Sequence, residues 1–109
     1  MAIVLPQPIA DYFSADAGSS ADAIAQCFTP TAVVKDEGRT YTGRAAIHRW
    51  KVESSAKYTY TSEPRTIAEE NGRMAVTNHL VGDFPGSPAD LRYFFVLDGQ
   101  KIAELEVIP

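Results

Sequence analysis

The second half of the sequence is a run of β-type segments separated only by short turns, and this run most constrains the fold. Residues with β character occupy positions 58–61, 73–84, 91–97 and 101–108. The turns between them include Asn71-Gly72, a pair that tolerates the positive φ angles of a tight hairpin. Segments joined in this way form an antiparallel meander, and a meander with long members twists and curves. The sequence therefore predicts a curved antiparallel sheet.

The first half of the chain has mainly helical periodicity. Apolar residues recur at helical spacing in three stretches, which are Ile9, Tyr12 and Phe13, then Ile24, Cys27 and Phe28, then Ala46, Ile47 and Trp50. Ser19 or Ser20 is placed to cap the second helix, and residues 31–36 alternate as a strand that 39–42 extends. Helices followed by a strand run indicate an α+β fold of order ααβαββββ, with three helices covering the concave side of the sheet.

Length and charge exclude several classes of protein. A chain of 109 residues predicts one domain, residues 1–109, because a second core could not close in so short a chain. Ten Lys and Arg against fourteen Asp and Glu give a net charge of −4, so we expect no nucleic-acid partner. Apolar runs are too short for a membrane span, and the N-terminus does not resemble a signal peptide. We therefore expect a cytoplasmic protein that does not bind membranes.

The strand at residues 73–84 has two faces, and both are apolar enough to be buried. Its even positions are the more apolar and include Val76 and Leu80, whereas the odd positions are only half polar. A sheet that tolerates burial on both faces predicts a homodimer through its convex face. If the even face is concave, Asn78 enters the cavity and His79 lies on the dimer side; the opposite orientation would make His79 a candidate acid or base. We favour the first arrangement on burial ranking.

Several stretches of the sequence, in this order, resemble the nuclear transport factor 2-like superfamily, and within it SnoaL-like and ketosteroid-isomerase-like domains. They are Tyr12-Phe13, the segment FTPTAVVKD at 28–36, the segment YTGRAAIHRW at 41–50, and the hairpin segments FPGSP at 84–88 and YFFVLDGQKI at 93–102. The resemblance covers nearly the whole chain. It implies a cystatin-like cone in which a pocket lies between the helices and the concave face of the sheet.

The resemblance also implies site residues. In the isomerases of this group a tyrosine of the first helix donates to an oxyanion, and an aspartate at the end of the first strand is the general base; these positions match Tyr12 and Asp36. The second donor of the family, an aspartic acid on the penultimate strand, falls at about Tyr93, which departs from the family pattern. Desolvation raises the proton affinity of a carboxylate, and a phenol can stabilise an enolate, so the chemistry is consistent.

Each of these residues also has a structural interpretation. Asp36 shares a strand face with Ala32 and Val34 and so points into the cavity, or else it caps the turn that follows. Tyr12 is either a pocket donor or a core tyrosine with its hydroxyl at the rim. Further residues expected at the ligand are Trp50, Tyr58, Asn78, Tyr93 and Phe95; Trp50 serves equally as core packing, and Tyr58 and Tyr60 share a face that lines either the cavity or the dimer.

Other polar groups are interpreted as surface. His48 and the cluster of Arg44, Arg49, Lys51 and Lys57 are expected on the solvated face of the third helix. The two histidines share no ligand spacing, and the glycines have no phosphate-loop context, so we expect no metal and no cofactor.

The function predicted from sequence is the binding of a small apolar or amphipathic molecule. If the protein is an enzyme, the expected reaction is of the isomerase or lyase type, with Asp36 as base. The alternative is a non-catalytic ligand-binding or dimerisation module of the same fold. A protein-binding domain like the transport factors is a third, weaker alternative, because no exposed apolar stripe remains beyond the sheet face assigned to the dimer.

Overall fold

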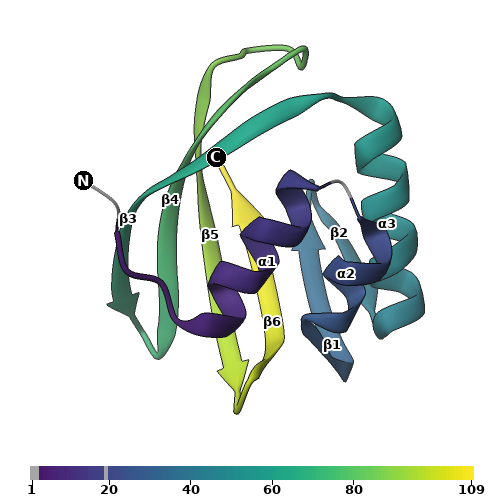
Figure 1. Cartoon of the computed structure of the whole chain (residues 1–109), viewed down its shortest axis with the longest axis vertical. Helices are drawn as coiled ribbons and strands as arrows, with labels where there is room; N and C mark the ends of the chain where they lie inside the picture. The colour runs from purple at the N-terminus through teal and green to yellow at the C-terminus, as the bar shows by residue number, and fades with distance from the viewer. Residues whose placement is uncertain (1–2, 19) are drawn as a thin grey trace.

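The structure, a computed structural model, describes residues 3–18 and 20–109. The elements of this part of the chain follow in the order ααββαββββ. Their bounds are α1 Gln7–Ala17, α2 Ala21–Gln26, β1 Phe28–Asp36, β2 Arg39–Thr42, α3 Arg44–Lys57, β3 Tyr60–Glu70, β4 Arg73–Gly82, β5 Ala89–Asp98 and β6 Lys101–Ile108. The α+β class, the helices gathered on one face and the short strand at 39–42 are confirmed (Figure 1).

The six strands form one curved sheet in the order β2-β1-β6-β5-β4-β3. Neighbouring strands are antiparallel with one exception, because β1 pairs with β6 in parallel, for example Val34 with Leu105. The sheet is therefore mixed, and the expectation of a purely antiparallel sheet was wrong at this pair. The cause is the crossover through α3: the chain leaves β1 and β2, re-enters at the far edge as β3, and returns beside β1 only after three hairpins.

The junction of α2 and β1 also differs from the sequence prediction. Ser20 caps α2 as expected, since its Oγ accepts a hydrogen bond from the Ala23 backbone N–H at 3.1 Å; Ser19, the alternative cap, lies outside the described residues. The helix ends at Gln26 rather than Phe28. Phe28 is fully buried and pairs with Ile102 of β6, so tertiary pairing overrides the helical spacing of its side chain.

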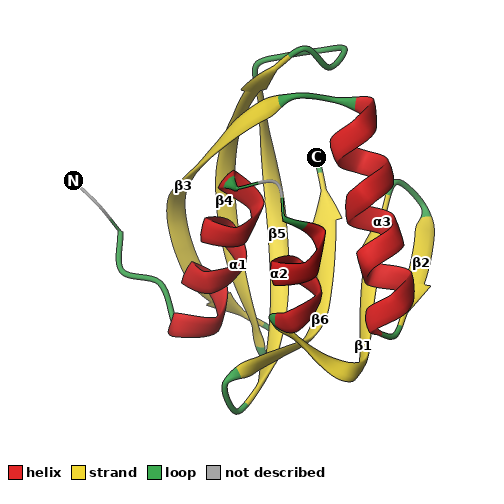
Figure 2. Ribbon diagram, turned by 45° about the vertical axis from the view of Figure 1, so that its right-hand side comes forward, coloured by secondary structure: helices red, strands yellow, loops and turns green. Residues whose placement is uncertain are grey.

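The long hairpin of β3 and β4 determines where the sheet curves over the helices. Asn71 and Gly72 form its turn with φ angles of 54° and 78°, as predicted. At the other end β4 stops at Gly82, where a Cβ atom would lie 2.3 Å from the Thr59 carbonyl oxygen, so only glycine fits. The loop at residues 83–88 then arches towards the C-terminal end of α3 (Figures 1 and 2).

The core lies between the helices and the concave face of the sheet (Figure 2). Even positions of β4 face it: Val76 and Asn78 are fully buried and Leu80 nearly so, whereas Val81 on the other face is 47% exposed. The favoured orientation of this strand is thus confirmed. His79 lies on the convex face, where its Nδ1 is 2.8 Å from Oδ1 of Asp90 on β5.

Candidate functional site

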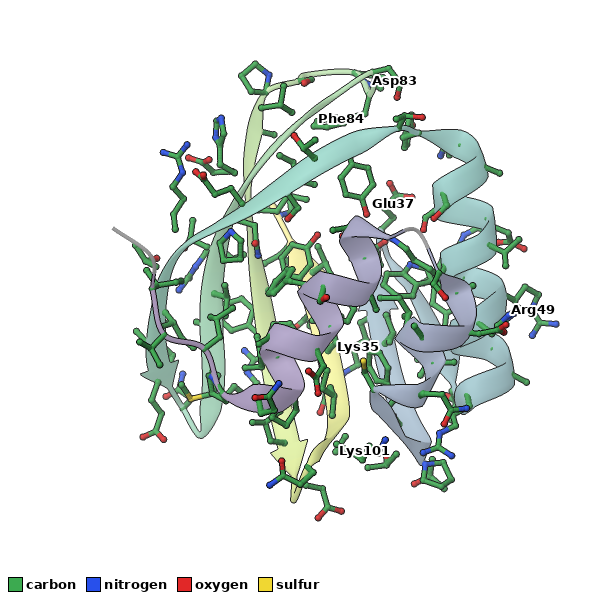
Figure 3. The ribbon with its side chains drawn as sticks, viewed as in Figure 1. Lys35, Glu37, Arg49, Asp83, Phe84 and Lys101 are labelled. Atoms are coloured by element: carbon green, nitrogen blue, oxygen red, sulfur yellow. The ribbon has the colours of Figure 1, made fainter. Side chains whose placement is uncertain are left out.

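A cavity of about 710 Å³ opens at one end of the molecule, between α3, the β1–β2 turn and the loop at residues 83–88. All five tyrosines and the single tryptophan of the chain line it; they are Tyr12, Tyr41, Trp50, Tyr58, Tyr60 and Tyr93. Phe84 and Glu37, which also line the cavity, lie at the same end of the molecule in Figure 3, whereas Arg49 points away from α3.

The phenylalanines are distributed differently. Among the five, Phe84 lines the cavity, Phe13, Phe28 and Phe95 belong to the packed core, and Phe94 lies on the convex face. A tyrosine or tryptophan combines a large apolar ring with a polar group that needs a partner or solvent. The aromatic part of the cavity wall is therefore built mainly from rings that offer hydrogen bonds, whereas most phenylalanines lie in the core.

Asp36, the last residue of β1, lines this cavity. The Trp50 indole Nε1–H of α3 donates a hydrogen bond to its Oδ2 at 3.0 Å. Burial raises the pKa of the Asp36 carboxyl above its usual 3.8, an effect that the Trp50 hydrogen bond opposes and the neighbouring Glu37 charge reinforces. The result is a carboxylate that binds a proton more strongly than one in water, beside a cavity lined by both aromatic and charged residues.

Tyr12 of α1 and Tyr93 of β5 both line the cavity and pack edge-on against each other, with ring centroids 6.3 Å apart. Their residues are 2% and 4% exposed. Burial, and then the nearby ionisable groups Asp16, Tyr60 and Asp36, raise the pKa of both phenols well above 10. Both hydroxyls therefore keep their protons at neutral pH. Among the described residues, neither hydroxyl is a fully buried group that lacks a hydrogen-bond partner.

Tyr58 lies nearer the cavity mouth. Its ring packs edge-on against Phe84, with centroids 6.3 Å apart, and the ammonium of Lys57 lies 5.1 Å from its centroid. Both Tyr58 and Tyr60 line the cavity. The structure therefore puts this pair on the concave side of the sheet, one of the two alternatives that the sequence left open.

Asn78 and Phe95 lie outside the cavity lining among the described residues. Phe95 is covered by Tyr12 and Phe13 of α1, at centroid distances of 5.6 and 5.9 Å. The Asn78 side chain is fully buried, with Oδ1 accepting from Ser62 Oγ at 3.3 Å and Nδ2 without a partner in this part of the chain. Both residues face the concave side of the sheet, as expected, but lie within the packed core rather than at the cavity wall.

A buried ion pair beside the cavity was missed by the sequence interpretation. Lys51 of α3 is 2% exposed and donates to Asp16 of α1, which is 8% exposed. The expectation that Lys51 lies on the solvated face of α3 was wrong. A signal was present: Lys51 follows Ile47 by four residues and Asp16 follows Tyr12 by four, so each interrupts the apolar stripe of its helix at a buried position.

Other sequence expectations concern the surface and metals. His48 is half exposed and pairs with the exposed Asp22, at 2.7 Å from Nε2 to Oδ1, as expected for a surface residue. Within residues 3–18 and 20–109 there is no group of three or more His, Cys, Asp or Glu side chains that could hold a metal ion. The described helices include none with the length and apolar character of a membrane span.

Comparisons with known proteins assign this arrangement to a family. The model of the SnoaL-like domain matches residues 9–105. A search of curated proteins gives no significant match. The fold is similar to that of a proposed polyketide cyclase from Sinorhizobium meliloti, with 38% identity, a TM-score of 0.88 and 94% of each chain covered.

Two more distant structures share the fold alone. A protein with a ketosteroid isomerase-like fold from Catenulispora acidiphila, solved with trimethylamine, has 18% identity and a TM-score of 0.84, over 97% of this chain and 87% of that one. TerC, co-crystallised with polyporic acid, has 17% identity and a TM-score of 0.77, over 93% and 87% of the two chains. On the family match over residues 9–105, the chain belongs to the SnoaL-like domain family.

Proposed function

We propose that the cavity binds a small, mostly apolar or amphipathic carbonyl compound and that Asp36 acts on it as a general base. The observation that carries this proposal is the Asp36 carboxyl, whose pKa is raised by burial and which lines a cavity walled by tyrosine and tryptophan rings. The protein is then an enzyme of the isomerase or lyase type. Trp50 and Tyr58 provide apolar surface for the ring or chain of the ligand.

The proposed reaction is a proton transfer next to a carbonyl group. Asp36 accepts a proton from the carbon beside the carbonyl, and the electron pair moves onto the carbonyl oxygen to give an enolate. Tyr12 and Tyr93 donate hydrogen bonds to that oxygen while keeping their own protons. If the compound has a C=C bond next to the deprotonated carbon, Asp36 returns the proton to the far carbon of that bond, which isomerises the compound. If it has a leaving group on the β carbon, the electron pair expels that group instead.

The relatives support a carbonyl-bearing or aromatic ligand. The structure with 38% identity is a proposed polyketide cyclase, and TerC, which shares the fold, was co-crystallised with polyporic acid. The aromatic wall of the present cavity, with a few polar groups facing inward, fits the same kind of molecule.

Hydrogen–deuterium exchange tests the base directly and requires no knowledge of the natural substrate. We expect the protein to accelerate exchange of the acidic C1 protons of 2-tetralone in D₂O, followed by NMR. Asp36→Asn should lower the rate about 10²- to 10⁴-fold, as expected for a lost general base, while keeping the fold by circular dichroism. Asp90→Asn, on the convex face, is the control. Full exchange activity in Asp36→Asn would remove Asp36 from the mechanism.

A non-catalytic binding module is the second candidate, and the Trp50–Asp36 hydrogen bond favours it. The hydrogen bond from the indole N–H fixes the Trp50 ring in the cavity wall, and this role of Asp36 requires no proton transfer. In this case the wild-type protein binds 2-tetralone, as measured by calorimetry, but does not accelerate exchange. Acceleration that depends on Asp36 excludes this alternative.

We further propose that two chains associate through the convex face of the sheet. Strand alternation puts the exposed Val81 and Ile108 on this face, together with Phe94, which lies beneath the guanidinium groups of Arg73 and Arg92 at 4.3 and 4.8 Å. Sedimentation at micromolar concentration should give twice the mass of one chain. A single species near 11.9 kDa would contradict the dimer.

A further inference from the structure

Three side chains from three elements meet behind the inner wall of the cavity. Lys51 of α3 donates a hydrogen bond to Oδ1 of Asp16 on α1 and another to the Tyr60 hydroxyl on β3, the latter at 3.0 Å. The Tyr60 hydroxyl donates to Asp16, at 3.1 Å from Oδ1 and 3.4 Å from Oδ2. Buried charges are retained in proteins only when they are paired and hydrogen-bonded, and here each charge has two partners.

The bonds within this triad are unequal. Lys51 and Asp16 make the closest contact of the three. The bond from Tyr60 to Asp16 is long for an O–H donor and is divided between two oxygens, so its geometry is poor. The Tyr60 hydroxyl is therefore the donor of the triad that can turn its hydrogen bond towards a better acceptor. Asp16 would remain neutralised by Lys51 if that happened.

Tyr60 is also the member of the triad that reaches the ligand cavity. It lines the 710 Å³ cavity with Tyr12 and Tyr93, and it lines a second, small cavity of about 60 Å³ with Asp16 and Lys51. Its ring thus separates the buried charges from the space available to a ligand. An ammonium that donates to a phenol oxygen polarises the O–H bond and strengthens that phenol as a donor.

We propose that Tyr60 is a third hydrogen-bond donor to an oxyanion in the cavity, and that the Lys51–Asp16 pair positions its hydroxyl and supplies positive charge behind it. This inference rests on the proton-transfer function proposed above and names its ligand class more closely, as a compound that carries or develops an enolate or phenolate oxygen. When the oxyanion forms, the Tyr60 hydrogen bond turns from Asp16 to the ligand. The proton stays on Tyr60 throughout, and Lys51 keeps both of its contacts.

The test compares two probes of similar shape, 4-nitrophenolate and nitrobenzene, at a pH where the first is ionised. All protein variants in this test also carry Asp36→Asn. The neutral Asn side chain imitates Asp36 after it has accepted the proton, which is its state when the enolate is present. Binding is measured by calorimetry. We expect Tyr60→Phe to weaken 4-nitrophenolate about tenfold or more, because a hydrogen bond to a charged acceptor is lost, and to leave nitrobenzene within about twofold. Thr61→Val, on the opposite face of β3, is the matched control.

The ion pair is tested by neutralising both partners together, since Lys51→Met alone would leave Asp16 buried and unpaired. The double variant Lys51→Gln with Asp16→Asn keeps hydrogen-bonding groups at both positions. We expect it to reduce the preference for 4-nitrophenolate over nitrobenzene several-fold, and to make the further effect of Tyr60→Phe smaller. A merely structural pair would lower stability without changing that preference.

The outcomes separate this inference from the function on which it rests. If Tyr60→Phe keeps the full preference for the anion while Tyr12→Phe or Tyr93→Phe loses it, Tyr60 is a structural residue and the proposed function stands. If none of the three tyrosines affects the anion, or neither probe binds, the oxyanion site itself is wrong. Loss of 2-tetralone exchange in Asp36→Asn is measured independently of both.

Discussion

Tyr93 and Phe95 lie two residues apart on β5 and face the same side of the sheet, but only Tyr93 lines the cavity. Both rings pack against Tyr12 and Phe13, but Phe95 is fully buried, whereas Tyr93 is 4% exposed and lines the cavity. Over two residues of the strand, the surroundings thus change from packed core to cavity wall. The change from phenylalanine to tyrosine marks the boundary, because a hydroxyl buried without a partner costs about 1–3 kcal/mol. Around Phe95 the molecule is built for stability, and around Tyr93 it is built to present hydrogen bonds.

The largest effect that follows from this contrast concerns Phe95. We expect Phe95→Ala to lower the free energy of unfolding by about 3–5 kcal/mol, since it removes a large ring from a fully buried site. Urea denaturation measures the change. A cost below about 1 kcal/mol would mean that this end of the interior is loosely packed, and the contrast with Tyr93 would fail.

Tyr93→Phe should have the reverse profile. Removing one hydroxyl from the cavity wall should change the free energy of unfolding by less than about 1 kcal/mol, because no hydrogen bond to another described residue is lost. The exchange of 2-tetralone protons should fall about 10- to 100-fold, as expected for a lost hydrogen bond to a charged oxygen. NMR exchange rates and urea denaturation of the same sample give both values. A large loss of stability with unchanged exchange would assign Tyr93 to the core.

The same two residues show what the sequence could and could not predict. Alternation along a strand is local, so the facing of Tyr93, Phe95 and Asn78 was predictable. The depth of a residue along the cavity depends on where α1 covers the sheet, which no local pattern specifies. Asn78 and Phe95 were therefore expected at the ligand and lie outside the cavity lining.

Contacts between distant segments were the least predictable part. The parallel pairing of β1 with β6 depends on the order in which the meander returns, and local spacing carries no information on that order. The Lys51–Asp16 pair was within reach, because opposite charges interrupt two apolar helical stripes. Two such interruptions of opposite sign predict that the two charged side chains meet, as Lys51 and Asp16 do.

The smallest expected effect concerns Asp36, at the boundary between the two environments. Burial raises its pKa in the folded protein, so between its usual 3.8 and the raised value the folded state holds more protons than the unfolded chain. Stability is then lost as the pH rises through this interval, because the unfolded state gives up its proton first.

Asp36→Asn does not titrate but can still accept the hydrogen bond from Trp50. The unfolding free energy of the variant minus that of the wild type should therefore increase from acidic to neutral pH. Urea denaturation of both proteins across this range measures the difference, in which the other carboxyls cancel. A flat difference would mean that Asp36 is as well solvated in the fold as in the unfolded chain, and a carboxylate of that kind would not be the stronger base that the cavity requires.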